Sequence, residues 1–298
     1  MESRIRKGLL SLVAGFMVAG LPGVGVASEG GGTQYTGGAE HFMGGVAPPP
    51  GDYLINYSIY YSAGRANDAR GHGIPVSFGL NVEADAIRYM HVSNVEVLGG
   101  NWLFYAVEGV ARQEVSVGGR HQIKVGATDP LVDPVAVGWH AGNFHWVAGV
   151  DLMLPTGAYD KKDLSNIGHH YLGIQPLFGF TYLNAEGVEA SIKLMYVFNT
   201  RNEATRYQSG QDFHTDFIVG KHFDGWTAGI GGYALQQTSD DSVNGVTVAD
   251  ARGRVIALGP RASFRLGTVG VTASWDHEMA VQNRPVGDKG WLKLFIPL

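Results

Sequence analysis

The chain has no cysteine and few charged residues. Its 298 residues include 22 lysines and arginines and 27 aspartates and glutamates, which gives 16% charged residues and a formal net charge of −5. The absence of cysteine excludes disulfides, thiolate nucleophiles and Cys-bound zinc. Because the basic residues form no cluster in the sequence, we expect neither a nucleic-acid partner nor capture of an anionic membrane surface by charge. A water-soluble protein usually carries more charge, so the composition favours a membrane environment.

Long apolar runs are also scarce, and the one that exists lies at the N-terminus. Arg4, Arg6 and Lys7 precede an apolar stretch, and Val26-Ala27-Ser28 supplies small residues for signal peptidase. This pattern predicts a cleaved secretory signal peptide over residues 1–28. The alternative is an uncleaved membrane helix, but Pro22 and three nearby glycines would interrupt it. Nothing downstream reaches 18 consecutive apolar residues, the length that a membrane-spanning helix needs.

Residues 29–51 are too rich in glycine and proline to form a strand, and Pro48-Pro49-Pro50 favours a polyproline-like path. This segment is expected to be an N-terminal arm, and two positions are open for it. It is either a periplasmic tail or a plug folded into the interior of the domain that follows.

What the sequence does contain is alternation of apolar and polar side chains. Between Tyr53 and Leu298, segments of about ten residues alternate in this way, and Gly/Asn/Asp-rich breaks separate them. A strand that crosses a bilayer needs about 9 to 11 tilted residues, whose side chains point alternately to lipid and to lumen. A soluble sandwich would also alternate. Here, however, short breaks at 141–143, 184–187, 224–225 and 267–268 alternate with longer ones at 63–74, 157–168, 200–210 and 239–250. The break at 93–101 is long for a short turn.

The sequence therefore predicts an all-β fold: a single antiparallel transmembrane β-barrel of about 12 strands over residues 52–298, with the Gly/Pro-rich arm before it. The expected strands are Asp52–Ser62, Pro75–His91, Trp102–Val117, Asp129–His140, Asn143–Pro155, His169–Leu183, Val188–Asn199, Gln211–His222, Gly225–Thr238, Arg252–Leu266, Val269–Gln282 and Gly290–Leu298.

Each strand is expected to turn its apolar face to lipid and its polar face to the lumen. On this basis Val82, Ala84 and Ala86 face lipid, as do Leu103 and Tyr105. Tyr53, Tyr57, Tyr61, Trp139, Trp146, Tyr182, Trp226 and Trp275 are expected at the headgroup levels. The candidate lumen-lining residues are Glu83, Asp85, Glu108, Arg112, Glu114, Asp151, Lys193, His214, Asp216, Arg261, Arg265, Asp276, Glu278 and Lys293. They either form a selectivity lining or pair with one another to fill the barrel.

Candidate metal and catalytic sites are weak. His140 and His145 flank a short turn and His169-His170 starts the next hairpin, but neither spacing matches a zinc site. Asp160 and Asp163 lack the spacing of a calcium loop. Because no G-x-S-x-G elbow is present, no catalytic residue, cofactor or metal is predicted.

Several long segments carry a family resemblance. These are GWHAGNFHWVAGVDLMLPTGAYD from Gly138, KLMYVFNT from Lys193, YQSGQDFHTDFIVGKHFDGWTAGIGGYALQQ from Tyr207, and NRPVGDKGWLKL from Asn283. GGAEHFMGGVAPPPG in the arm and the following NYSIYYSA belong to the same pattern. Together they resemble the outer-membrane β-barrel proteins associated with the meta-pathway of phenol degradation. The resemblance implies uptake of small hydrophobic or aromatic compounds and brings no catalytic residue.

The expected function is thus a passive channel in the bacterial outer membrane, reached through the signal peptide. Membrane lipid and a small hydrophobic or aromatic substrate are the expected partners, and the oligomeric state is open. Two alternatives belong to other classes. One is a closed barrel that binds a ligand or partner through its extracellular loops, and the other is an outer-membrane hydrolase that depends on a histidine such as His214.

Overall fold

The computed structural model describes residues 27–298. The predicted signal peptide lies almost wholly in residues 1–26, outside the described residues, so its cleavage stays a prediction. Within residues 27–298, no helix is long and apolar enough to cross a membrane. The helical structure described is the short 3-10 turn η1, Glu29–Gly31.

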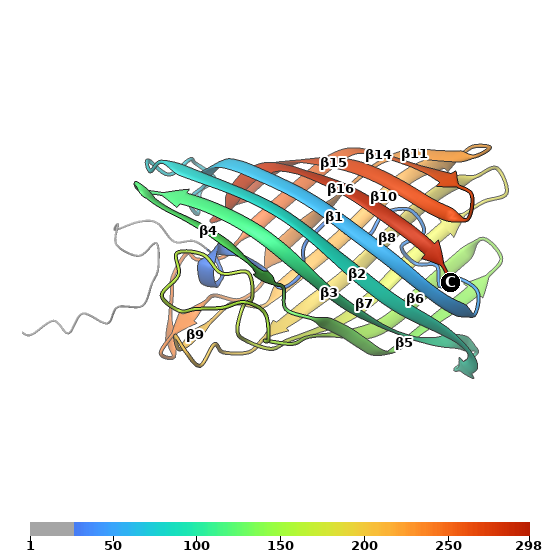
Figure 1. Ribbon diagram of the computed structural model, residues 1–298, viewed down its shortest axis with the longest axis horizontal. Coiled ribbons are helices and arrows are strands. Elements are labelled where there is room, and N and C mark those ends of the chain that lie inside the picture. Colours follow the sequence, from blue (N-terminus) through green and yellow to red (C-terminus); the bar gives the residue numbers. More distant parts are fainter. Residues whose placement is uncertain (1–26) are drawn as a thin grey trace, which may run out of the picture.

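Twelve antiparallel strands close into a single barrel, which confirms the predicted fold (Figure 1). Hydrogen bonding runs in the order β2-β1-β16-β15-β14-β11-β10-β8-β7-β6-β5-β3, and a further pairing between β2 and β3 closes the ring. The barrel strands are β1 Gly51–Ala66, β2 Phe78–Val97, β3 Gly100–Val117, β5 Leu131–Ala141, β6 Phe144–Met153, β7 Gly173–Leu183, β8 Val188–Asn199, β10 Asp212–His222, β11 Trp226–Gln237, β14 Arg254–Leu266, β15 Val269–Gln282 and β16 Pro285–Pro297.

The two ends of the barrel differ. At one end, here called the turn end, short connections join the strands, and both the start of β1 and the C-terminus lie there (Figure 1). At the other, the loop end, long connections cover residues 67–77, 154–172, 200–211 and 238–253. Three short strands lie in these loops, β9 Tyr207–Gln208, β12 Ser242–Val243 and β13 Val246–Thr247. Short turns at one end and long loops at the other are typical of outer-membrane barrels.

Several details of the strand prediction were wrong. The last strand, β16, begins at Pro285 and not at Gly290. The break expected at 93–101 is a two-residue turn, because β2 continues to Val97 and Leu98-Gly99 turns with φ of 51° and 77°. Positive φ at both positions gives the tight hairpin turn that matches the twist of antiparallel strands. The prediction also missed β4, Arg120–Ala127, which forms a hairpin with the loop-end half of β3 before β5 pairs with the rest.

Strand β8 shows how alternation places side chains on opposite sides of the wall. Val188, Ile192 and Phe198 point outward and are exposed, while Glu189, Lys193 and Met195 point inward and are buried. Strand β6 repeats the pattern, with Phe144 outward and Asp151 inward. The outward rows suit contact with acyl chains, because charge there would be costly.

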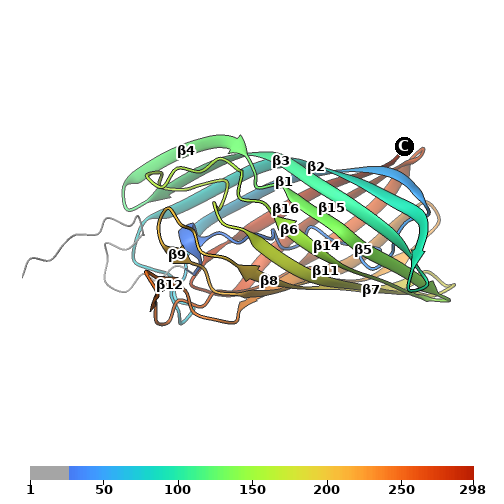
Figure 2. The same cartoon turned by 90° about the horizontal axis from the view of Figure 1, so that it is seen from below.

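Residues 27–50 lie inside the barrel. Figures 1 and 2 show this dark-blue segment passing between opposite walls, from η1 at the loop end to β1 at the turn end. Buried side chains of the barrel gather around it, among them Tyr57, Leu103, Tyr105 and Trp291, with Ala39 of the segment packed against the same cluster. The interior is therefore a packed core.

Candidate functional site

The candidate site is the lumen together with the arm that occupies it, residues 27–50. Its centre is Glu40 of the arm, whose carboxylate meets three cations of the wall. Oε1 lies 2.9 Å from Arg88 of β2 and 3.8 Å from Lys193 of β8, and Oε2 lies 2.9 Å from Lys293 of β16. All four side chains are at most 15% exposed. Only β1 lies between the strands of Arg88 and Lys293, whereas β8, which carries Lys193, lies on the opposite side of the ring, so one carboxylate ties the arm to two opposite parts of the wall.

A second anchor lies beside the first, at Asp216 of β10. Its carboxylate accepts a hydrogen bond from the Tyr35 hydroxyl at 2.6 Å and from the backbone amides of Gly38 at 2.8 Å and Glu40 at 3.0 Å. Asp216 is 2% exposed. Donors that converge on a buried carboxylate satisfy its charge. Asp216 therefore fixes the backbone on either side of Gly38, where φ is 86°.

Towards the turn end, the arm approaches the wall closely. The Met43 amide donates to Glu189 at 2.6 Å, and the Gly45 amide donates to the hydroxyl of Thr181 at 2.9 Å. A Cβ at Gly45 would lie 2.5 Å from the backbone of Phe180. Only glycine fits at that distance, because the neighbouring atoms are backbone and cannot rotate away.

At the loop end the arm is held by Asp241, which lies in the loop before β12. The carboxylate of Asp241 accepts a hydrogen bond from the amide of Ser28 at 2.9 Å, from Gly210 at 2.6 Å and from the hydroxyl of Tyr207. Burial raises the pKa of Asp241, while these hydrogen bonds oppose the rise. The arm is thus fastened at both ends and at its middle.

The wall around the arm is rich in tyrosine rings that contact cations. Arg88 lies over the rings of Tyr57 at 5.2 Å and Tyr105 at 4.6 Å from the centroids. Lys289 lies 4.1 Å from the centroid of Tyr233. Such contacts stabilise a desolvated cation by an amount that grows with burial.

A further ion pair belongs to the wall itself. Arg261 of β14 and Asp276 of β15 pair at 2.8 Å, and both side chains are fully buried. On the same strand Glu278 accepts hydrogen bonds from Tyr61, Tyr233 and the amide of Gly287. These contacts join strands of the wall to one another, including strands that are not adjacent, rather than arm and wall.

The structure places the predicted lumen-lining residues in two groups. The first group lies on the inward face of the strands: Asp151, Lys193, His214, Asp216, Arg261, Arg265, Asp276, Glu278 and Lys293. Of these, Asp216 accepts hydrogen bonds from the arm, and Lys193 and Lys293 contact Glu40 of the arm. Arg265 lies at the turn end and is exposed there.

The second group corrects the prediction, because Glu83, Asp85, Glu108, Arg112 and Glu114 point outward. Alternation on β2 and β3 fixes this, since Arg88 and Tyr105 point into the lumen and these five lie on the opposite parity. They pair across strands instead of facing the arm: Asp85 accepts from Asn56 at 2.8 Å and Ser58 at 2.7 Å. Glu114 contacts Arg112 and His121, both at 3.1 Å.

The physical reason is the filled interior. The rule that polar faces line the lumen holds for a wet pore, whereas on β2 and β3 the inner face is mostly apolar, and Met90, Val92, Leu103 and Tyr105 pack in the core around the arm. The residues expected to face lipid on these strands, Val82, Ala84, Ala86, Leu103 and Tyr105, lie on the inward face instead.

The predicted position of three tyrosines on β1 is also corrected. Tyr53, Tyr57 and Tyr61 were expected at the headgroup levels, but they point inward, and Tyr57 and Tyr61 contact Lys293 and Lys289. Arg88 and Lys289 were missed altogether. Arg88 lies on the same face of β2 as Ala84 and Ala86. An arginine in this otherwise apolar row was the one sequence signal that the row faces the lumen.

The candidate metal and hydrolase residues stand as follows. His140 and His145 are cross-strand partners whose Nδ1 atoms lie 2.7 Å apart at the turn end. Across residues 27–298 no three His, Asp or Glu residues are grouped to hold one metal ion. His214 is 1% exposed and packs edge-on against Tyr35 at 5.5 Å, and none of the hydrogen bonds described for these residues joins it to a serine.

Residues 63–294 match the model of the family described as "Putative MetA-pathway of phenol degradation". The chain belongs to this family. That assignment confirms the resemblance found in the sequence, and it covers the barrel from the loop-end part of β1 into β16. No curated protein matches the chain.

Solved structures share the fold of this family member. An outer membrane channel from Pseudomonas putida F1 aligns with a TM-score of 0.76 at 15% identity, over 87% of this chain and 99% of that one. The β domain of the Bordetella autotransporter BrkA aligns at 0.51 and 12% identity, over 83% and 99% of the two chains. The transport unit of the autotransporter AIDA-I from Escherichia coli aligns at 0.51 and 11%, over 86% and 93%. At these identities the likeness concerns the fold.

Proposed function

We propose that the protein is an outer-membrane channel for uptake of small hydrophobic or aromatic compounds, and that residues 27–50 form a plug that must shift for passage. Support comes from the closed barrel, from the family's link to phenol degradation, and from the similar fold of the Pseudomonas putida F1 channel. The loop end is then extracellular and the turn end periplasmic, as in other outer-membrane barrels. Passage is passive, and no chemical step is assigned to the lumen.

The observation that carries the proposal is the way in which the arm is held. Glu40 and Asp216 fasten it by charge and hydrogen bonds that no covalent bond reinforces. When the arm leaves the lumen, these carboxylates and cations can exchange their contacts with one another for contacts with water. A plug that is held by ionic contacts gives two states of the lumen, one filled and one open.

The substrate class follows from the surface that the plug covers. Tyr57, Tyr105 and Tyr233 present rings, and Arg88 and Lys289 supply positive charge beside them. A flat aromatic compound with a partly negative oxygen, such as a phenol, suits this combination, because its ring stacks on tyrosine while its oxygen accepts from a cation. The predicted residues on the inward face would then line the path of the substrate.

Uptake of a phenol-type compound into proteoliposomes tests the proposal. After subtraction of the uptake by empty vesicles, vesicles with the protein should take up radiolabelled phenol or benzoate faster than glucose. Tyr105→Ala should reduce the aromatic preference, and Tyr60→Ala, whose side chain is 52% exposed on the outer wall, is the matched control. Equal uptake of aromatic compounds and sugars would contradict the substrate class.

The closed-barrel alternative also has an observation in its favour, because the arm fills the lumen in this structure. In that case ligand binding would depend on the loops at the loop end and not on lumen residues. Loss of ligand binding after shortening of residues 238–253, with no effect of Glu40→Gln, would favour this alternative over the channel.

A further inference from the structure

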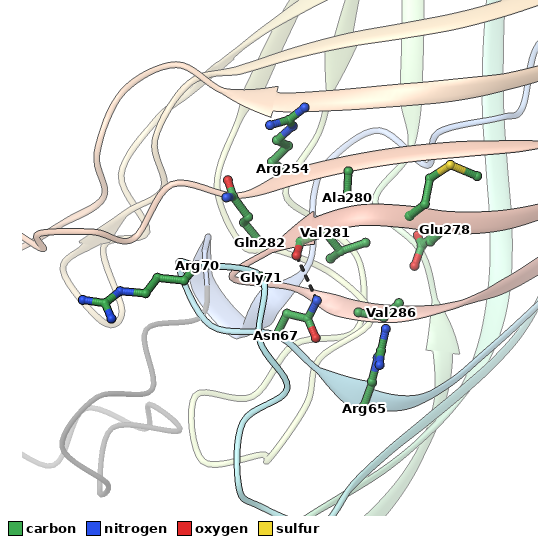
Figure 3. Close-up of a pocket in the computed structure, with 11 residues that line it drawn as sticks. Arg65, Asn67, Arg70, Gly71, Arg254, Glu278, Ala280, Val281, Gln282 and Val286 are labelled. Atoms are coloured by element: carbon green, nitrogen blue, oxygen red, sulfur yellow. Dashed lines mark hydrogen bonds between the residues drawn. The ribbon is translucent and has the colours of Figure 1, made fainter.

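A cavity of about 290 Å³ lies in the wall at the loop end (Figure 3). It is bounded by Arg65 of β1, Gly71 of the loop that follows β1, Arg254 of β14 and the last residues of β15. Two irregularities shape it. Ala280 takes a φ of 51°, and the register between β14 and β15 shifts between Arg254 and Ile256. Bulges of this kind bend a strand and redirect its side chains.

Three arginines are among the residues that line this cavity, Arg65, Arg70 and Arg254. Across residues 27–298, no hydrogen bond or ion pair is described for the side chains of Arg65 and Arg254. The carboxylate of Glu278, which also borders the cavity, is already occupied by Tyr61, Tyr233 and the amide of Gly287. These donors are neutral, so Glu278 keeps its charge, but three arginines outnumber this one carboxylate and the charge of the cavity lining is net positive.

Figure 3 shows how these side chains are arranged. Arg254 and Arg65 stand on opposite sides of the ends of β15 and β16, and the side chain of Arg70 extends away from the other lining residues. Since β15 and β16 lie between β14 and β1, three strand spacings separate the two arginines. At about 4.8 Å each, this is roughly 14 Å. The two positive groups can thus contact separate anionic groups of one large ligand.

The cavity also has an apolar side. Met279 lies on the outward face of β15 and is 40% exposed, and Leu258 continues the same outward row at 37% exposure. This row leads from the cavity along the outer wall towards the turn end. A ligand with an anionic head and an acyl tail would match both features, because its tail can follow the wall in the membrane.

From this combination we infer that the cavity binds phosphate groups carried by a lipid of the outer leaflet, as in the phosphorylated glycolipid headgroup of lipopolysaccharide. Arginine suits this ligand, since its planar fork donates two hydrogen bonds to one phosphate. The inference rests on the proposed outer-membrane location, because that location places the loop end at the level of these headgroups. Free phosphate has the same chemistry and is the other possible source.

The test measures lipopolysaccharide binding to the purified full-length protein in detergent by thermophoresis. Arg65→Gln with Arg254→Gln should weaken binding about tenfold or more, because each change removes a charge-assisted contact with phosphate. Lys161→Gln with Lys162→Gln is the matched control, since it removes the same charge from a loop outside the cavity, and it should leave binding within about twofold of wild type. Dephosphorylated lipopolysaccharide should bind as weakly to wild type as the intact lipid binds to the arginine variant.

Three results are decisive. An equal loss in both double variants would overturn the inference, as would full binding of dephosphorylated lipid to wild type. Binding of inorganic phosphate alone that disappears in the arginine variant would keep the anion site and assign it to free phosphate. Heat-modifiable migration on a gel shows that each variant is folded. Aromatic uptake by the arginine variant should match wild type, so failure of this inference is distinct from failure of the channel proposal.

Discussion

Replacement of Glu40 by glutamine should open the channel. The change keeps the size of the side chain but removes the charge that three buried cations share, with contacts of 2.9 Å to Arg88 and Lys293 and 3.8 Å to Lys193. Breaking a buried ion pair by removal of one partner costs about 3 to 5 kcal/mol, because the remaining charges stay buried without compensation. Here that cost falls on the docked arm, since the cations regain water when the arm leaves.

The size of the effect follows from this free energy. At about 1.4 kcal/mol for each factor of ten, the lower figure of about 3 kcal/mol raises the ratio of undocked to docked arm by about two orders of magnitude. Single-channel recording in planar bilayers should show this as a much larger fraction of time in the open state, at an unchanged open-state conductance.

Glu83→Gln is the matched control, because Glu83 lies on the outward face of β2 and does not touch the arm. Its recordings should match those of wild type. If the Glu40 variant, shown to be folded by heat-modifiable migration, keeps the open fraction of wild type, Glu40 does not hold the arm in the lumen. An equal increase in the Glu83 variant would lead to the same conclusion, because the effect would then not depend on the lumen.

Three further predictions concern the arm and the wall. Asp216→Asn should raise the open fraction about tenfold, since a neutral amide holds the three donors on Asp216 less strongly than a carboxylate, and single-channel recording measures this. Gly45→Val should expose the arm, since a Cβ there would lie 2.5 Å from wall backbone, and a chymotrypsin-type protease should then cut faster after Phe42 than in wild type. Arg261→Met should destabilise the barrel by about 3 to 5 kcal/mol, because Asp276 is left buried and unpaired. Its urea unfolding midpoint should fall, and the added change Asp276→Leu should restore most of it, whereas no recovery would contradict the pairing argument.

The fold could be predicted from the sequence because alternation and break length are local signals. Strand β8 is the clearest case, since the outward residues from Val188 to Phe198 are all apolar and the inward ones include Glu189 and Lys193. Strands β6, β15 and β16 follow the same rule, and their apolar faces were assigned correctly to the outside.

The faces of β2 and β3 could not be assigned in the same way. Alternation separates two faces but does not tell which of them meets lipid. On β2, one face carries Glu83 and Asp85 and the other carries Arg88, so either orientation places charge on the outer wall. The deciding fact was the position of the arm, because its Glu40 draws Arg88 inward.

The centre of the site was beyond the sequence for a related reason. Glu40 meets residues that are 48, 153 and 253 positions further along the chain, namely Arg88, Lys193 and Lys293. No spacing rule connects them, since the contacts exist only after the ring has closed around the arm. Composition could tell that the arm was not a strand, but its glycine content fits a free tail as well as a segment that needs close approach to a wall.

The most direct test of the central claim, that the arm closes the lumen, compares single-channel recordings of the intact chain with those of a chain that lacks residues 29–50. The intact protein should be mostly closed, with brief openings, and the shortened protein should be open for most of the recording and pass a larger current. Equal current and equal open time in the two proteins, both folded, would contradict this claim.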